Sequence, residues 1–371
     1  MRIGFDSKRL FHNATGLGNY SRDLLRILYH YYPENEYVLY NPKPTEAYAD
    51  FLQKIKYLER NPKGLWRNFK SLWRSYGVKN QIRKDQLDIY HGLSGELPLG
   101  ISTQVKTVVT VHDLIFMRYP ELYQPVDRRT YFLKFKSAAK RADLVVAISE
   151  QTKNDIVDFL QINPEKIRVI YQGCAPVFKE NFSLEEMQQV KKKFSLPDQF
   201  VLNVGTIEPR KNALLIAKAI KNIDIKLVLI GKPTSYFRQI MEYARENKME
   251  EKIMHLQGIT QRELALVYRL ATVMVYPSFF EGFGIPIVEA LFSKTPVITS
   301  ENGVFPEAGG LGSMYINPED EYQLGQKIEF LLNNPEEIPL RVEKGYQYAQ
   351  NFTDQQLAKQ WDLVYKNLLK I

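Results

Sequence analysis

The amino-acid sequence predicts an α/β protein made of two doubly wound domains, each built on a parallel sheet. The chain has 371 residues, more than one hydrophobic core usually supports, so two domains of somewhat under about 200 residues each are expected. Short β-rich runs alternate with helical patterns along the whole chain, which is typical of successive βα units. One stretch near the middle, without a clear period, divides the alternation into two series.

The first series precedes Tyr171 and contains about six β-rich runs. In chain order they read RIGF, YVLY, LDIYH, TVVTVHD, LVVAIS and IRVIY. The second series, of similar length, reads FVLNVG, KLVLIG, KIMHLQG, VMVYPS, PVITS and SMYIN. The segment between them, QGCAPVFKENFS from Gln172 to Ser183, contains glycine and proline. We therefore predict domains at residues 1–175 and 184–353.

A terminal helix is predicted for residues 354–371, because apolar side chains recur there at helical spacing. This apolar face must cover another part of the protein. It consists of Leu357, Trp361, Val364, Tyr365 and Leu368.

The sequence indicates a cytoplasmic protein. No stretch approaches the roughly 18 consecutive apolar residues of a membrane span, and the opening MRIGFDSKRL is typical of a strand and its loop rather than a signal peptide. The single cysteine, Cys174, cannot form an internal disulfide, which agrees with a reducing compartment.

Positive charge gathers in one segment, from Lys54 to Lys84, where ten basic residues face one acid, Glu59. The net charge of +8 favours an anionic partner. Two interpretations of this segment stay open: an amphipathic helix that lies on an anionic membrane surface, or one that packs on its own domain. Nucleic-acid binding is disfavoured, because no nucleic-acid motif accompanies the charge. The predicted apolar face comprises Leu65, Trp66, Phe69, Leu72, Trp73 and Tyr76, flanked by Arg67, Lys70 and Arg74.

The stretch FFEGFGIPIVE, which follows the strand TVMVYPS, combines a glycine loop with the start of a helix. Ligands of open α/β sheets bind at the carboxyl ends of strands, and a helix start favours anions. The loop would offer the backbone amides of Phe283, Gly284 and Ile285 to a phosphate. Glu281 before the glycines and Glu289 in the first helical turn would bind neutral hydroxyls at either end of the phosphates, although each has an ordinary structural alternative.

Two further strand ends carry residues suited to a phosphorylated sugar. TIEPRKN follows the first strand of the second domain, and its Arg210 and Lys211 could neutralise a diphosphate and stabilise it as a leaving group. In the first domain, His112 directly follows a buried strand and could contact a sugar hydroxyl. Gly16 and Gly18 lie at a helix start, which suits close approach to phosphate.

Three classes of enzyme are disfavoured. The sequence contains no Asp-x-Asp and no His-x-x-x-His, so no metal is expected. A serine hydrolase would need a Gly-x-Ser-x-Gly elbow, which is absent. The dinucleotide fingerprint is incomplete, with Ser21 where a third glycine would stand.

With these residues in view, the chain resembles the family 4 retaining glycosyltransferases of the GT-B fold, nearly from end to end. The motifs that carry the resemblance are GLGNYSRDLL, VVTVHDL, VVAISE, IRVIYQG, VGTIEPRKN, EGFGIPIVEAL and TPVITSENGVFPEAGG. The resemblance implies two Rossmann-like domains that face a central crevice. It assigns the acceptor to the first domain and the nucleotide sugar to the second, and implies that the terminal helix crosses back to the first.

The resemblance also implies roles for individual residues. Arg210 and Lys211 would contact the diphosphate, Glu289 the ribose, and Glu281 with the loop amides the donor sugar. His112 would lie near the reacting sugar, as a catalytic residue with Glu281, Arg210 and Lys211. The remaining donor-binding residues would be Thr206, Gly231, Ile259, Gly16 and Gly18, and the acceptor or membrane side would hold Trp66, Arg67, Lys70, Trp73 and Arg74.

The implied reaction is metal-independent transfer of a hexose with retention, without a cofactor. The branch it looks most like uses GDP-mannose in bacterial polysaccharide assembly, with a saccharide or lipid-linked saccharide as acceptor and a place at the inner face of the cell membrane. Gln172, where the family usually has Asn, and GVFPEAGG around Phe305 depart from the pattern. A sugar-nucleotide epimerase of the same fold and a non-catalytic membrane-associated sugar or nucleotide binder remain as alternatives.

Overall fold

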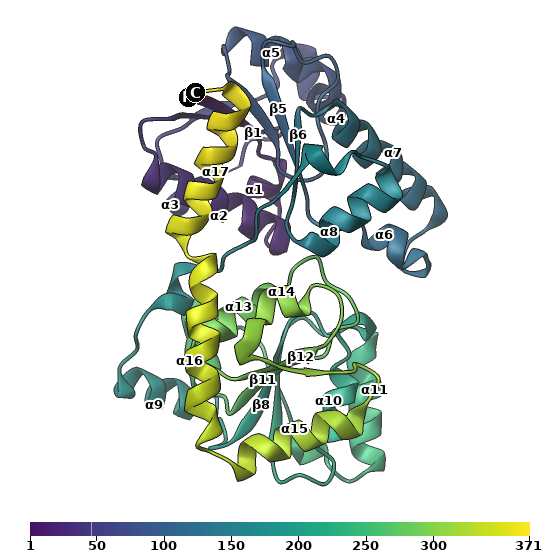
Figure 1. Cartoon of the computed structure of the whole chain (residues 1–371), viewed down its shortest axis with the longest axis vertical. Helices are drawn as coiled ribbons and strands as arrows, with labels where there is room; N and C mark the ends of the chain where they lie inside the picture. Colours follow the sequence, from purple (N-terminus) through teal and green to yellow (C-terminus); the bar gives the residue numbers. More distant parts are fainter. Residues whose placement is uncertain (46) are drawn as a thin grey trace. The chain divides into compact units, whose positions relative to one another are not determined.

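The computed structural model of the chain describes residues 1–45 and 47–371. The chain forms two compact units, which are described separately (Figure 1). Unit 1 comprises Met1–Gln172 and Thr353–Ile371, and unit 2 comprises Gly173–Phe352.

Unit 1 is built on a parallel sheet of seven strands in the order β3-β2-β1-β4-β5-β6-β7. Each β-rich run predicted before Tyr171 contains one of these strands. The additional strand, β3, lies at the sheet edge inside the basic segment, and its short charged sequence LER carries no apolar alternation that would reveal it. The strands are β1 (Arg2–Asp6), β2 (Glu36–Tyr40), β3 (Leu58–Arg60), β4 (Ile89–Gly92), β5 (Lys106–Val111), β6 (Leu144–Ala147) and β7 (Ile167–Val169).

Helices cover both faces of this sheet, because alternate side chains of each strand point to opposite faces. Leu39 and Val108 belong to a core with α2 and α17, whereas their neighbours Val38 and Val109 belong to a second core with α5 and α7. The helices of unit 1 are α1 (Lys8–His12), α2 (Gly16–Tyr31), α3 (Ala49–Leu52), α4 (Lys70–Leu72), α5 (Val78–Lys84), α6 (Ile115–Arg118), α7 (Pro125–Arg141), α8 (Glu150–Asp155) and α17 (Asp354–Leu369).

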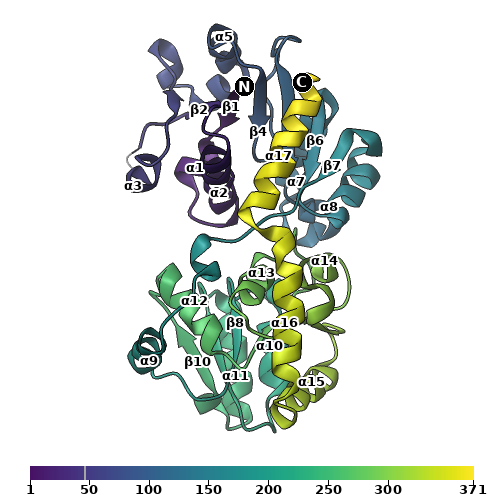
Figure 2. The same ribbon diagram turned by 60° about the vertical axis from the view of Figure 1, so that its left-hand side comes forward.

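The terminal helix α17 lies against α2 on one face of the unit 1 sheet (Figures 1 and 2). Leu357, Trp361 and Tyr365 are fully buried in that core. At the start of the helix, Asp354 forms an ion pair of 2.7 Å with Arg26 of α2. The apolar face predicted for this helix therefore covers the first sheet.

Unit 2 contains a second parallel sheet, of six strands in the order β10-β9-β8-β11-β12-β13. Every β-rich run predicted after Tyr171 contains one of them. They are β8 (Phe200–Val204), β9 (Lys226–Ile230), β10 (Ile253–Leu256), β11 (Val273–Tyr276), β12 (Val297–Ser300) and β13 (Met314–Ile316). Two parallel sheets between helices confirm the predicted fold class.

The helices of unit 2 pack in pairs as well as on the sheet. Helices α10 and α15 contact each other, and so do α13 and α16. The helix α12 begins with a capping box in which Thr260 and Glu263 exchange hydrogen bonds. The helices are α9 (Leu184–Lys193), α10 (Ala213–Ala219), α11 (Ser235–Glu246), α12 (Gln261–Leu270), α13 (Ile285–Phe292), α14 (Phe305–Gly309), α15 (Glu321–Asn333) and α16 (Glu337–Ala349).

The basic segment of unit 1 differs from the predicted amphipathic helix. A short 3₁₀ helix, η1 (Gly64–Arg67), comes first, and α4 then continues through a π-helical turn, η2 (Trp73–Gly77), into α5. Trp73 is 4% exposed and belongs to the core, which contradicts a contact between this side chain and a membrane. The guanidinium of Arg74 is also turned into unit 1, where it pairs with Asp6 and Glu96, so Arg74 does not face a membrane, and its place on the acceptor side stays a prediction.

The other members of the predicted apolar face are exposed to solvent. Leu65 is 82% exposed, Phe69 55% and Leu72 51%. Residues 63–72 form an unbroken exposed run that includes Lys63, Arg67 and Lys70. Packing on its own domain therefore explains only part of the segment. Among the described residues, no helix is long and apolar enough to cross a membrane.

Candidate functional site

The candidate site of unit 2 lies where the strand order of its sheet reverses. The chain runs outward from β8 through β9 to β10 and then returns to place β11 on the other side of β8. The carboxyl ends of β8 and β11 therefore diverge into loops that leave on opposite sides, which is the usual ligand-binding position of an open α/β sheet. Arg210 and Lys211 follow β8, and Glu281 follows β11.

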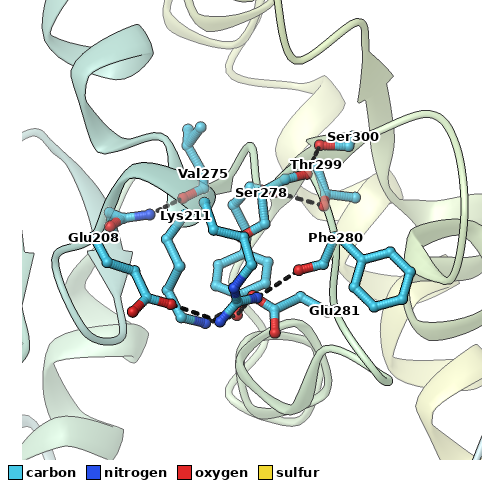
Figure 3. Close-up of polar contacts among 11 residues, drawn as sticks. Glu208, Lys211, Val275, Ser278, Phe280, Glu281, Thr299 and Ser300 are labelled. Atoms are coloured by element: carbon cyan, nitrogen blue, oxygen red, sulfur yellow. Dashed lines mark hydrogen bonds and ion pairs between the residues drawn. The ribbon is translucent and has the colours of Figure 1, made fainter. Parts of the chain in front are cut away.

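The structure brings these three side chains together in one ion cluster (Figure 3). The Glu281 carboxylate lies 2.7 Å from the Lys211 ammonium and 2.8 Å from the Arg210 guanidinium. Glu208 pairs with the other side of Arg210 at 2.6 Å. The two positive charges of Arg210 and Lys211 are thus matched by the two negative charges of Glu281 and Glu208.

Tyr276, the last residue of β11, contacts both Lys211 and Glu281 and completes the cluster. Lys211 donates a hydrogen bond to the Tyr276 hydroxyl, which donates to Glu281 at 2.9 Å. The ammonium also lies 4.9 Å from the centre of the tyrosine ring. Tyr276 is only 1% exposed, so its ring is held firmly by its surroundings. Its two contacts with Lys211 therefore fix the position of the ammonium at the carboxyl end of the strands.

Burial and ion pairing act in opposite directions on Glu281. Burial alone would raise the pKa of its carboxyl, but Lys211 and Arg210 outweigh that effect and hold the pKa below its usual value. Glu281 is therefore a carboxylate at neutral pH. Burial alone would lower the pKa of Lys211, but Tyr276 and Glu281 hold it above its ordinary value. Lys211 therefore stays positively charged, and the cluster keeps all of its charges.

The glycine loop ends in α13, whose first residue is Ile285. Gly284 caps the helix with a φ of +111°, a backbone angle that a side chain would strain. Phe283 is buried, with its ring 5.5 Å from that of Phe352. Because α13 begins at Ile285, Glu289 is its fifth residue and lies in the second turn, one turn later than the sequence pattern predicted.

Glu289 is half-buried within unit 2. It accepts a hydrogen bond of 3.0 Å from the hydroxyl of Tyr268, which comes from α12. Burial raises the pKa of the Glu289 carboxyl to about 7, although the Tyr268 hydrogen bond partly opposes this. Near neutral pH Glu289 is therefore only partly ionised, whereas Glu281 is stabilised as an anion.

The remaining residues predicted to bind the donor lie at the ends of β8, β9 and β10. A Cβ on Gly231 would stand 1.8 Å from the carbonyl oxygen of Gly205, so this glycine lets the loops after β8 and β9 touch. Thr206 is half-buried in the first of these loops, and Ile259 is half-buried just after β10. All three follow strands at the same edge of the sheet as Lys211.

In unit 1, His112 follows β5 and is 8% exposed. Its Nε2 lies 2.9 Å from the carbonyl oxygen of Leu93, and its Nδ1 lies 3.2 Å from the side-chain nitrogen of Gln172. Burial lowers the pKa of His112 to about 4, so the ring is neutral at physiological pH.

The two glycines of the predicted phosphate loop, Gly16 and Gly18, differ in how much space surrounds them. A Cβ on Gly18 would meet the carbonyl oxygen of Asn13 at 1.7 Å, whereas Gly16 has open space.

The sequence pattern missed an ion cluster at the equivalent position in unit 1. Its strand order reverses between β1 and β4. Asp6 ends β1 and Glu96 follows β4, and Arg74 reaches both carboxylates. Asp6 is 4% exposed. A carboxylate as the last residue of a buried strand was the available signal. In unit 2, Glu208, Tyr268 and Tyr276 were missed likewise, because only contacts distant in sequence give them a role.

Among the residues that the structure describes, no group of three or more histidine, cysteine, aspartate or glutamate side chains is arranged to hold a metal ion.

Two family models match the chain, one on each side of the junction between the units. The model for Glycosyltransferase Family 4 matches residues 19–176. The model for Glycosyl transferases group 1 matches residues 185–351. The second match contains the ion cluster after β8 and β11 together with α13, and the first contains His112.

Curated relatives include mannosyltransferases. The O-antigen chain mannosyltransferase RfbU of Salmonella typhimurium is 30% identical over 247 residues, covering 66% of this chain and 65% of its own. The serotype-specific mannosyltransferase WbdA of Escherichia coli is 30% identical over 240 residues, but the chain spans only 29% of its length. The O-antigen chain mannosyltransferase B of Escherichia coli is 26% identical, covering 99% of this chain and 100% of its own.

Solved structures share the fold at lower identity. The Anabaena protein HepE, in complex with UDP-glucose, superposes with a TM-score of 0.78 at 16% identity, covering 99% of this chain and 100% of its own. WaaG, a glycosyltransferase involved in lipopolysaccharide biosynthesis, has a TM-score of 0.70 at 14% identity and covers 99% of both chains. The paired family models, the relatives and the two parallel sheets agree: the chain belongs to the family 4 glycosyltransferases of the GT-B fold.

Proposed function

We propose that this chain is a retaining, metal-independent hexosyltransferase that moves mannose from GDP-mannose to a saccharide or lipid-linked saccharide in bacterial polysaccharide assembly. The observation that carries the proposal is the balanced cluster of Arg210, Lys211 and Glu281 where the unit 2 sheet reverses its order. The names of the O-antigen mannosyltransferase relatives support the choice of mannose. GDP is inferred from the same branch of the family.

In this proposal the diphosphate of the donor takes the place that Glu281 now holds beside the two cations. Arg210 and Lys211 keep their charges when buried, so they can stabilise the diphosphate as negative charge develops on it during departure. The positive end of α13 at Ile285 adds to that field. Released from the cations, Glu281 binds hydroxyls of the sugar, and Glu289 binds the ribose.

His112 of unit 1 is proposed to lie near the transferred sugar, Gly16 near the donor, and Thr206, Gly231 and Ile259 around the nucleoside. The acceptor hydroxyl would attack the anomeric carbon on the face from which the diphosphate leaves. Its proton would pass to a diphosphate oxygen, so that the C–O bond to the diphosphate breaks as the new glycosidic bond forms. No protein nucleophile is invoked.

Binding calorimetry with GDP, UDP, ADP and NAD, each with and without magnesium, tests the donor. We expect GDP to bind alone and without any need for magnesium. Binding of none of them, or of NAD only, would contradict the assignment of Arg210 and Lys211 to a diphosphate. Consumption of GDP-mannose without an acceptor and without release of GDP would favour the epimerase instead.

The variant Lys211→Met tests the leaving-group role. We expect the rate of acceptor-dependent GDP release to fall by roughly two to three orders of magnitude, as when one preorganised donor is removed from an oxyanion site. The matched control is Lys218→Met on α10, because Lys218 pairs with Glu321 away from the cluster. A Lys211→Met protein with an unchanged melting temperature and near-normal turnover would remove Lys211 from the mechanism.

We also propose that unit 1 binds the inner face of the cell membrane through the exposed run at residues 63–72. Exposed Leu65, Trp66 and Phe69 stand beside Lys63, Arg67 and Lys70, which combines apolar insertion with attraction to anionic lipid headgroups. Such a position would place the enzyme next to a lipid-linked acceptor.

Sedimentation with vesicles tests this surface. Wild-type protein should pellet with vesicles that contain phosphatidylglycerol and much less with pure phosphatidylcholine, and the double variant Trp66→Ser with Phe69→Ser should stay in the supernatant. The control changes two exposed apolar residues of unit 2, Leu311 and Tyr322, to Ser. Equal pelleting of both double variants would contradict the proposal.

A further inference from the structure

The imidazole of His112 is fixed by two hydrogen bonds of different kinds. A carbonyl oxygen can only accept, so the 2.9 Å contact between Nε2 and the Leu93 carbonyl requires a proton on Nε2. In the neutral ring Nδ1 then carries a lone pair, and the side-chain amide of Gln172 must donate to it across 3.2 Å. Each assignment requires the other.

The surroundings of the ring leave it little freedom. His112 is 8% exposed and Gln172 6% exposed. The ring of Tyr20 meets the imidazole in an edge-to-face contact, with centroids 4.5 Å apart. The charged or titratable groups that act on the ring are Arg9, His91 and Tyr20, and burial together with Arg9 lowers its pKa to about 4. The hydrogen bond to the Leu93 carbonyl opposes this shift but does not outweigh burial, so the ring stays neutral.

We propose that Gln172 is a positioning residue, which holds the buried His112 ring in one orientation and in its neutral, Nε2-protonated form. The inference rests on the proposed function, in which His112 lies near the transferred sugar. Its chemical consequence is that His112 neither gives nor takes a proton during transfer, since both ring nitrogens are engaged inside unit 1. His112 then contributes as a fixed neutral group beside the reaction.

The position of Gln172 in the chain supports this role. It is the last residue of the first segment of unit 1, and the chain enters unit 2 at Gly173. Its side chain reaches back to His112 at the end of β5. The backbone position at this junction therefore affects the orientation of the His112 ring.

The tautomer can be observed directly by ¹⁵N NMR of histidine-labelled full-length protein. We expect His112 to show a protonated Nε2 and an unprotonated Nδ1 near neutral pH. The variant Gln172→Met, which is similar in size and cannot donate, should change the ¹⁵N shifts of His112. His255 makes a comparable pair with Gln257 in unit 2, at 3.4 Å, and its unchanged signals provide an internal reference.

Kinetics distinguish positioning from a purely structural role. Gln172→Met should lower kcat about tenfold with KM for GDP-mannose changed less than about twofold, because the released ring would no longer keep its orientation beside the reacting sugar. The control is Thr107→Val, which removes the 2.7 Å hydrogen bond to Asp143 at the opposite end of β5. It should cost similar stability and leave kcat unchanged.

A second variant, Gln172→Glu, replaces the hydrogen-bond donor beside Nδ1 of His112 with an acceptor. Its carboxylate accepts, so both ring nitrogens of His112 should become protonated and the rate should fall further than in Gln172→Met. A wild-type spectrum with Nδ1 protonated, or an unchanged kcat in Gln172→Met, would overturn the inference. A wild-type protein that transfers no sugar would refute the proposed function instead, and the spectra would still decide whether Gln172 sets the tautomer.

Discussion

At the scale of single residues, the ion cluster after β8 and β11 is electrically balanced before a ligand enters. The positive charges of Arg210 and Lys211 are neutralised by the carboxylates of Glu208 and Glu281. Tyr276 holds Lys211 in place through a hydrogen bond. Preorganised charges of this kind require little reorganisation during reaction. Any anion that binds beside Arg210 and Lys211 must compete with Glu281, so this carboxylate limits the affinity of the cluster for anions.

Glu289 predicts a pH dependence of stability. The unfolded chain releases this proton near the usual pKa of glutamate, about 4.5, whereas the folded protein keeps it up to a pKa of about 7. The folded state therefore binds more protons in that interval, and the free energy of unfolding of unit 2 falls as pH rises through it. The loss should amount to at most about 3 kcal/mol.

Calorimetric melting of wild type and Glu289→Gln between about pH 5 and pH 8 measures this effect. The variant keeps an acceptor for Tyr268 but cannot ionise, so its melting temperature should fall less over the interval. GDP affinity should rise with pH in wild type only, if ribose hydroxyls donate to ionised Glu289. Parallel melting curves for the two proteins would show that Glu289 is not the group responsible.

At the scale of elements, α17 joins unit 1 through a polar contact inside an apolar core. The Tyr365 hydroxyl lies 2.8 Å from Nδ1 of His91, whose Nε2 lies 2.8 Å from the Thr110 hydroxyl. Trp361 packs beside the same imidazole, with ring centroids 4.9 Å apart. Burial lowers the pKa of His91 to about 3, so α17 packs against a neutral imidazole.

The variant Tyr365→Phe tests the contribution of this contact. Leaving a nitrogen of His91 without its buried partner should lower the free energy of unfolding of unit 1 by about 1–3 kcal/mol. The three tryptophans, Trp66, Trp73 and Trp361, all belong to unit 1, so their fluorescence during urea denaturation reports on that unit. Tyr322→Phe on α15, where the tyrosine is 73% exposed, is the control and should leave the midpoint unchanged.

At the scale of the whole molecule, both units place an ion cluster where the order of their parallel sheet reverses. Unit 1 has Asp6, Arg74 and Glu96 between β1 and β4, and unit 2 has its cluster between β8 and β11. The reason is topological, since loops leaving neighbouring strands in opposite directions open space for side chains that no helix fills. The cluster of unit 2 combines two adjacent cations with a glycine loop and a helix start.

Much of this architecture follows from the sequence alone. Alternating β-rich runs and helical spacing are local patterns, so they predicted the strands of both sheets apart from the charged edge strand β3. They also predicted an apolar face on α17. Arg210, Lys211 and Glu281 could be proposed as site residues, because each follows a recognisable strand.

Only the tertiary structure decided which of these residues meet. Glu281 pairs with a lysine 70 positions earlier, and Arg74 reaches a carboxylate 68 positions away. Spacing along one element cannot predict such contacts, because they depend on how strands are ordered in the sheet. For the same reason Trp73 and Arg74 resembled surface residues in the sequence although the fold turns both inward, and the hydrogen bond between Gln172 and His112 could not be anticipated.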